Sequence, residues 1–178
     1  MEINANVIDM KALFSMTYGM YIVCTEYEGK KNGQIANTVM QITGEPVNIA
    51  ICLNKANYTT ELIGHSGVFS VSVLERDVPI TFIGRFGFKC GREIDKFQDV
   101  KYYKGVTGAP VVEDWSLAAL EIKVGQTLEL PTHVLFIGEV FHAKYLKDGN
   151  PLTYADYHLI KKGKSPKTAP TFGFNQLK

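Results

Sequence analysis

Apolar and polar positions alternate along much of the first 75 residues, a pattern typical of β-strands joined by short turns. The stretch YGMYIVCTEYEGKKNGQIANTVMQIT (18–43) predicts two strands joined by a turn rich in Gly, Lys and Asn that ends at an Asn-Gly pair. PVNIAICL (46–53) and VFSVSVL (68–74) predict two further strands. Between them, NYTTELIGHSG (57–67) has a Thr cap candidate, an early Glu and a final Gly, which predicts a short helix.

The pattern becomes irregular between residues 76 and 114, where PITFIGRFGF and GREIDKF are short helical candidates. We interpret this stretch as an insertion within one domain. Two long strands are predicted next, LAALEIKVGQTLEL (117–130) and HVLFIGEVFHAKYL (133–146), with Pro131 between them. A C-terminal extension, from about residue 148 to residue 178, is rich in Gly, Pro, Lys and Tyr and predicts no long amphipathic element.

About six strands with few helices predict a mainly β fold, an antiparallel barrel closed on itself, because closure removes exposed strand edges. Apolar residues on both faces of several strands indicate that one outer face is covered as well, which dimerisation would achieve. The chain has 178 residues, of which 46% are hydrophobic and 21% charged, so we expect one domain spanning residues 1–178.

Charge and cysteine content exclude several classes of function. The chain carries 19 basic and 18 acidic residues, so it offers no electrostatic basis for a nucleic-acid or membrane-surface partner. No apolar run approaches the roughly 20 residues of a membrane span, and the N-terminus lacks the pattern of a signal peptide. We expect a cytoplasmic protein. The chain has an odd number of cysteines, and they lie far apart in the sequence: Cys24, Cys52 and Cys90. This pattern predicts free thiols, with neither disulfides nor a metal site.

Two polar clusters interrupt this pattern, and the first begins at Asn37. Because side chains alternate along a strand, Asn37, Val39 and Gln41 would share one face and Thr38 would lie on the other. The Asn and Gln side chains offer donors and acceptors that suit a flat ring rich in heteroatoms. A solvated edge strand is the alternative interpretation.

The second cluster lies at the entrance of the predicted helix and combines free backbone N–H groups with side-chain hydroxyls, amides and one ammonium. Its members are Asn54, Lys55, Asn57, Tyr58 and Thr59. A dianionic phosphate needs several such donors at once, whereas a solvated helix cap needs one. This cluster therefore indicates a phosphate site.

Five segments taken together resemble the flavin reductase-like family with an FMN-binding split barrel, which includes flavoredoxins and the flavin domains of rubredoxin oxidoreductases. The segments are NGQIANTVMQIT, LNKANYTTELI, IGRFGFKCGREIDKF, THVLFIGEV and PLTYADYH. They occur in order from about Tyr18 to Phe172. The resemblance implies a Greek-key split β-barrel with a few short helices, a homodimer that shares its flavin sites, and non-covalent FMN.

The resemblance also implies roles for individual residues. The implied FMN ligands along the ring are Asn37, Thr38, Val39 and Gln41, and those at the phosphate are Asn54, Lys55, Asn57 and Thr59. Further implied cofactor-binding residues are Arg85, Phe86 and Gly87 of GRFGF, with Tyr154 and His158 closing over the flavin. His133 would lie where a nicotinamide docks and is the implied catalytic residue.

Other interpretations of some of these residues stay open. Phe86 is equally suited to the core of a buried turn, and a single histidine at a strand start, such as His133, is often structural. The basic run KKGKSPK is either a solvated tail or a docking site for an acidic electron partner.

The implied function is that of an FMN-dependent NAD(P)H oxidoreductase of the flavin reductase type, which passes electrons to flavin, iron or a redox protein such as a rubredoxin. A flavoredoxin-type electron carrier reduced by a protein partner is the alternative, and an FMN-binding module without turnover is a third. In such proteins the cofactor carries the chemistry, so the sequence needs no catalytic triad, paired carboxylates or metal ligands, and it shows none. It also has no G-x-G-x-x-G fingerprint, so NADH or NADPH would bind without a Rossmann fold.

Overall fold

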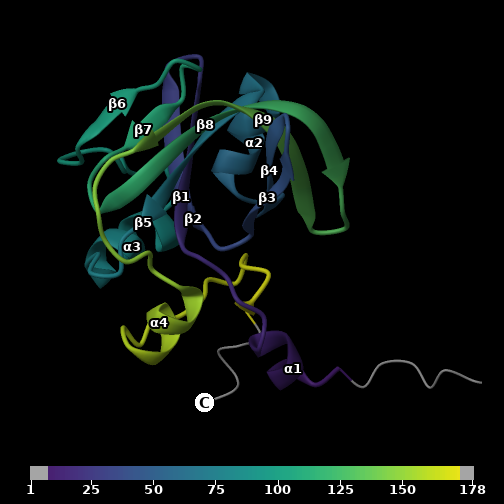
Figure 1. The fold of residues 1–178 in the computed structure, drawn as a ribbon, viewed down its shortest axis with the longest axis vertical. Helices are drawn as coiled ribbons and strands as arrows, with labels where there is room; N and C mark the ends of the chain where they lie inside the picture. The colour runs from purple at the N-terminus through teal and green to yellow at the C-terminus, as the bar shows by residue number, and fades with distance from the viewer. Residues whose placement is uncertain (1–7, 173–178) are drawn as a thin grey trace, which may run out of the picture.

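The computed structural model describes residues 8–172, which form one curved sheet with short helices around it (Figure 1). The seven antiparallel strands of this sheet run in the order β2-β1-β5-β8-β9-β4-β3. Their bounds are β1 Tyr21–Tyr27, β2 Lys30–Ala36, β3 Val39–Gly44, β4 Val47–Asn54, β5 Val68–Leu74, β8 Ser116–Glu129 and β9 His133–Tyr145. A separate hairpin consists of β6 Tyr102–Lys104 and β7 Pro110–Val112. The helices are α1 Met10–Phe14, α2 Tyr58–Ser66, α3 Ile80–Phe88 and α4 Tyr154–Leu159.

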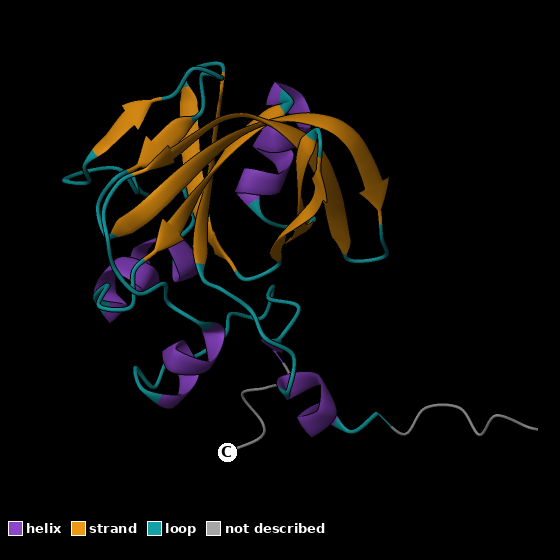
Figure 2. Ribbon diagram, in the orientation of Figure 1, coloured by secondary structure: helices purple, strands orange, loops and turns teal. Residues whose placement is uncertain are grey.

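The two edge strands of the main sheet, β2 and β3, follow one another in the sequence with only Asn37 and Thr38 between them. In a flat sheet with a strand spacing of about 4.8 Å, the first and seventh strands would lie about 29 Å apart. The three Cα steps from Ala36 to Val39 reach at most about 11 Å. The sheet must therefore curl until its edges meet at this corner, as Figure 2 shows. The predicted mainly β split barrel is confirmed.

Two clusters of buried apolar side chains form the core. The cluster inside the barrel includes Val23, Ile51, Ile63, Phe69, Ile122 and Phe136. Ile63 comes from α2, which lies within the curve of the sheet (Figure 1). The second cluster, which includes Met20, Leu74, Phe86, Leu152 and Tyr157, joins the end of the barrel to α3 and α4. The segment that contains α4 therefore packs against the second cluster, at the end of the barrel.

The first hairpin turns earlier than the sequence predicts. Its two central residues are Glu28 and Gly29, with φ angles of 49° and 75°, the left-handed pair that a type I′ turn requires. The Asn-Gly pair lies inside β2 instead. A Cβ atom on Gly33 would lie 2.7 Å from the Cys24 Sγ, so this glycine serves close packing between neighbouring strands. The predicted position of the turn was wrong.

The remaining elements follow the predictions with local differences. The helix expected over 57–67 is α2, but its N-cap is Asn57, and Thr59 lies in the first turn. PITFIGRFGF forms α3, whereas GREIDKF forms turns and no helix. The stretch 76–114 also contains the β6–β7 hairpin, which the sequence did not reveal, so the strand count of about six was too low.

Candidate functional site

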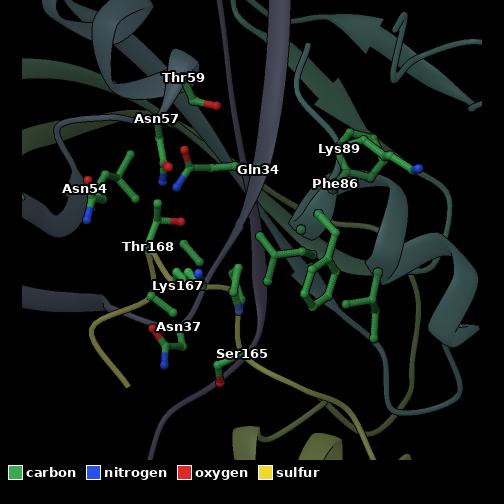
Figure 3. Close-up of a pocket in the computed structure, with 18 of the residues that line it drawn as sticks. Gln34, Asn37, Asn54, Asn57, Thr59, Phe86, Lys89, Ser165, Lys167 and Thr168 are labelled. Carbon is green, nitrogen blue, oxygen red and sulfur yellow. The ribbon is translucent and has the colours of Figure 1, made fainter. Parts of the chain in front are cut away.

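A cavity of about 330 Å³ lies between β2, the loop from β4 to α2, the C-terminal end of α3 and the segment before residue 171 (Figure 3). Its volume lies at the lower end of the range of about 300 to 1,000 Å³ that is typical of small-molecule sites. Every wall comes from a different part of the chain. The cavity therefore depends on the closed barrel and on the docking of the C-terminal segment.

The wall at the α2 entrance is rich in hydrogen-bonding groups. Asn54 ends β4, and its Oδ1 accepts a hydrogen bond of 2.9 Å from the Ala56 N–H. Asn57 is the N-cap of α2, yet its side chain makes no capping hydrogen bond. In Figure 3 the Asn57 and Gln34 amides point toward one another across the cavity. Free N–H groups at the start of a helix and an uncommitted amide suit an anionic ligand.

Two buried acceptors in this cavity have no hydrogen-bond partner among the described residues. They are Oδ1 of Asn32 and Oε1 of Gln34, both from β2. The Nδ2 of Asn32 is satisfied, because it donates to Thr59 Oγ1 at 2.9 Å. A buried acceptor without a donor is costly, so a ligand with N–H or O–H groups would be favoured here. The imide N–H and ribityl hydroxyls of a flavin are such donors.

The wall near α3 contains a buried lysine. Lys96 is 4% exposed, and its ammonium donates to the carbonyl oxygens of Gly33 at 2.8 Å and Phe86 at 3.3 Å. Burial lowers the pKa of Lys96 to about 8, against a partial opposing effect of the Cys90 and Cys24 thiols. Burial likewise raises the pKa of the Cys24 thiol to about 12. Lys96 is therefore held by main-chain carbonyls with no carboxylate partner among residues 8–172.

The last wall is formed by residues 163–171, which we call the C-terminal strap. Tyr154 of α4 holds both ends of this strap, because its hydroxyl is hydrogen-bonded to Ser165 Oγ and to Thr171 Oγ1. His158 Nδ1 donates to the Gly163 carbonyl at 3.0 Å. The Asn37 Nδ2 donates to Thr171 Oγ1 at 3.2 Å. The strap is thus fastened both to α4 and to the β2–β3 corner.

The structure brings about half of the predicted site residues to this cavity. Those that line it are Asn37, Asn54, Asn57, Thr59, Phe86, Gly87 and Tyr154. Those outside its lining are Thr38, Val39, Gln41, Lys55, Arg85, His133 and His158. Their roles in cofactor binding or catalysis stay predictions.

The residues outside the lining have other partners within the chain. Lys55 forms an ion pair of 2.8 Å with Glu129, and the Arg85 guanidinium donates to the Gln98 carbonyl at 2.6 Å. Gln41 donates to the Thr43 carbonyl at 3.1 Å. The Thr38 hydroxyl donates to Asn37 Oδ1 at 3.1 Å, Val39 packs against the barrel cluster, and His158 binds the strap.

His133 occupies a distinct position beside the phosphate segment. It faces Asn54 in the β4–β9 register, and its Nδ1 is hydrogen-bonded to Thr132 Oγ1 at 2.8 Å. Its Nε2 is buried and has no partner among the described residues. The position places an imidazole nitrogen near the α2 entrance, although outside the cavity itself.

Several residues of the cavity were missed from the sequence. Asn32 and Gln34 occupy alternate positions on β2, but Asn32 was assigned to the turn and Gln34 was not singled out. Lys96 lies in a stretch that was expected to be a helix and carries no recognisable motif. The strap was interpreted only as a tail or a docking site. Its prolines and small residues were the available signal of an ordered turn.

Within residues 8–172, no group of three or more His, Cys, Asp or Glu side chains is placed to hold a metal ion. None of the helices in this range has the length and apolar character needed to cross a bilayer.

Comparison with known proteins gives consistent matches. The family described as "Flavin reductase like domain" matches residues 13–161. The chain is 51% identical over 165 residues to the ferric-chelate reductase (NAD(P)H) of Archaeoglobus fulgidus, covering 93% of this chain and 98% of that protein. It is 49% identical to the high molecular weight rubredoxin of Moorella thermoacetica, covering 93% and 72% of the two chains. The structure of flavoredoxin from Methanosarcina acetivorans aligns with a TM-score of 0.69 at 26% identity, covering 85% and 80%.

Proposed function

The chain belongs to the flavin reductase-like family, and on that premise we propose that it is an FMN-dependent NAD(P)H oxidoreductase of the flavin reductase type. When bound, the flavin takes up a hydride from the nicotinamide and passes electrons to a second flavin, to iron or to a redox protein. The observation that carries this proposal is the cavity between β2, α2 and the strap. It combines an anion-binding helix entrance with buried acceptors that lack donors.

The residues of the cavity suit the two ends of FMN. Asn54, Asn57 and Thr59 surround the start of α2, where free backbone N–H groups would receive the phosphate. Asn32 and Gln34 would accept from the donors of the ring and the ribityl chain. FMN is preferred over FAD in this proposal because a cavity of about 330 Å³ leaves little room for an adenosine.

Buried side chains give the cavity walls a fixed position. Phe86 is 1% exposed and packs against Phe82 and Phe97, so its ring is a fixed wall of the cavity and not a mobile cover. The strap forms the wall of the cavity opposite α3. Since no acid or nucleophile of the chain is required for hydride transfer to a flavin, positioning and exclusion of water are the tasks left to the protein.

We propose that the protein acts as a homodimer whose partner covers the outer face of β3, β4, β9 and β8. Ile49, Ile51 and Leu53 of β4 point into the barrel, so Ala50 and Cys52 point outward. Met40 pairs with Ala50, and Leu128 lies beside Cys52 across β9, so both side chains share this outer face. They are 53% and 55% exposed. Cys52 also lines the cavity. A partner on this face would therefore border the flavin site, and residues outside the present lining would reach it.

A second candidate is a flavoredoxin-type electron carrier without direct nicotinamide turnover. It is supported by the similarity to the Moorella high molecular weight rubredoxin and to the Methanosarcina flavoredoxin. In either case we propose that the 178 residues act as a single flavin-binding domain, with 76–114 and 148–178 as additions to the barrel.

The deciding experiment is an anaerobic absorbance spectrum of the purified protein, followed by NADH and then NADPH. Flavin bands that bleach quickly with either nucleotide would support the reductase. A flavin that stays oxidised with both nucleotides but is reduced by a protein donor would favour the carrier. A protein that neither carries FMN nor binds added FMN would overturn the proposal. Chromatography of the released cofactor would distinguish FMN from FAD.

A further inference from the structure

A bound FMN brings a phosphate with a charge close to −2 into this cavity, and a cation is the usual counterpart of such a group. The sequence suggested Lys55, next to the α2 entrance. The structure directs Lys55 elsewhere, because its ammonium lies 2.8 Å from a Glu129 carboxylate oxygen and the residue does not line the cavity. Its charge is already paired, which leaves the counterion of the phosphate to be found.

Three other lysines line the cavity, Lys89, Lys96 and Lys164. Lys164 lies at the α4 end of the strap, where its carbonyl accepts a hydrogen bond of 2.8 Å from the Tyr157 hydroxyl. Lys96 donates to the Gly33 and Phe86 carbonyls, on the side of the cavity formed by α3. Lys89 follows α3, and Figure 3 shows it on the far side of the cavity from Asn54 and Asn57. Neither ammonium faces the start of α2.

Lys167 of the C-terminal strap has the required position. Figure 3 shows it beside Thr168, between Asn37 and the α2 entrance with Asn57. It lines the cavity, and within residues 8–172 no carboxylate lies at ion-pairing distance from it. It is thus a cation at the polar end of the cavity whose charge no described residue compensates.

The strap holds this lysine in a defined conformation. The Ala169 N–H donates to the Pro166 carbonyl at 2.9 Å, which makes Lys167 and Thr168 the two central residues of a turn. On either side of this turn, Ser165 and Thr171 are bound to the same Tyr154 hydroxyl. Pro166 further restricts the backbone. Because hydrogen bonds on both sides already hold this turn, the backbone of Lys167 loses little conformational entropy when a ligand binds.

We propose that Lys167 is a phosphate ligand of FMN and that the strap acts as a clasp, which completes the anion site begun by the N-terminus of α2. This inference rests on the proposed function, because it assumes FMN in the cavity. It assigns the strap a part in cofactor selection. A flavin with a terminal phosphate gains the contact with the ammonium, whereas riboflavin does not.

The test compares the affinities of flavin-free wild-type protein and Lys167→Gln for FMN and riboflavin, by quenching of flavin fluorescence. We expect Lys167→Gln to weaken FMN binding about tenfold or more, equivalent to about 1.4 kcal/mol. Riboflavin affinity should change by less than about twofold, because the lost contact involves the phosphate alone. The FMN loss should shrink as salt is raised, since salt screens the contact.

Two matched variants act as controls. Lys162→Gln removes the same charge from an exposed residue next to the strap that does not line the cavity, and it should bind FMN like the wild type. Lys55→Gln is compared because the family resemblance implies that Lys55 is the phosphate ligand. We expect a smaller loss of FMN affinity than in Lys167→Gln, because Lys55 does not line the cavity and is paired with Glu129.

Three results would overturn the inference. These are unchanged FMN affinity in Lys167→Gln, an equal loss for FMN and riboflavin, and a loss in Lys55→Gln with none in Lys167→Gln. In each of them the wild type still binds FMN, so the proposed function is judged separately. A wild type that binds no FMN overturns the proposed function and this inference together.

Discussion

The side-chain amide of Asn37 donates a hydrogen bond of 3.2 Å to the hydroxyl of Thr171, across 134 positions of the sequence. Asn37 lies at the corner where the two edge strands of the sheet meet, and Thr171 ends the C-terminal strap. This contact ties the closure of the barrel to the closure of the cavity. A residue that the sequence assigned to the flavin ring thus also fastens the segment that forms one wall of the cavity.

Replacing Thr171 with Val should loosen the strap. The buried Asn37 amide and Tyr154 hydroxyl each lose a partner, which should cost about 1 to 3 kcal/mol of unfolding free energy. FMN affinity should fall together with the stability, because the turn that carries Lys167 loses one of its anchors. Urea unfolding and flavin titration measure the two effects. Thr171→Ser keeps the hydroxyl and should restore both; failure of Ser to do so would refute the role of this hydrogen bond.

Replacing Leu128 with Glu should separate the proposed dimer. Leu128 lies on the outer face beside Leu135 in the β8–β9 register and is 55% exposed in the single chain. A carboxylate there would be buried without a partner in the assembly, at a cost of several kcal/mol. Sedimentation or size-exclusion chromatography should show a monomer with weaker flavin binding. Val106→Glu changes a residue that is 75% exposed on the distant β6–β7 hairpin and should leave the dimer intact.

Lys96 should make the protein less stable near neutral pH than at higher pH. Its pKa is about 8 in the folded protein and 10.5 when solvated, because burial disfavours the ammonium. Between these values the unfolded chain binds more protons than the folded one, so this contribution to stability rises with pH. Well below pH 8 the full penalty applies, and it amounts to roughly 3 kcal/mol.

Denaturant unfolding of wild type and Lys96→Met at pH 7.5 and pH 10.5 measures this effect. The stability of the wild type relative to Lys96→Met should increase between the two pH values. Burial raises the pKa of the Cys24 thiol to about 12, so this thiol lowers the stability above pH 9, and Lys96 partly offsets that pKa shift. Both proteins are therefore compared in a Cys24→Ala background. A difference that stays constant with pH would show that folding does not lower the pKa of Lys96.

Gly138 should not tolerate a side chain. A Cβ atom there would lie 2.4 Å from the Lys123 carbonyl oxygen, a backbone atom of the neighbouring strand that cannot move aside. We expect Gly138→Ala to cost at least about 2 kcal/mol through overpacking. Gly125→Ala, on the facing strand, is the matched control, since its Cβ would lie 3.9 Å from the nearest atom. Equal unfolding midpoints for the two variants would contradict the steric explanation.

The strand pattern was predictable because alternation and turn residues are local signals. The apolar strands β4, β5, β8 and β9 and the helix α2, ended by Gly67, all lie where the pattern placed them. The first turn was misplaced because Asn-Gly is a strong local signal, which here was overridden by tertiary packing. Gly33 is required by the approach of Cys24 and Phe86, and nothing in the neighbouring sequence reports that contact.

The candidate site was predictable where its residues lie on one short segment. Asn54, Asn57 and Thr59 surround the start of one helix, so a single stretch of sequence contains their chemistry. Asn32, Lys96 and Lys167 reach the same cavity from three distant segments. Their proximity is created by the closure of the sheet and by the docking of the strap, and single-sequence patterns do not encode it.

The position of the strap also determines the order in which the molecule acquires its parts during synthesis. The last strand of the sheet ends at Tyr145, so the barrel has all of its strands before residues 163–171 leave the ribosome. Until then the cavity lacks one wall. A nascent chain can therefore complete its barrel before the last wall of the cavity has left the ribosome.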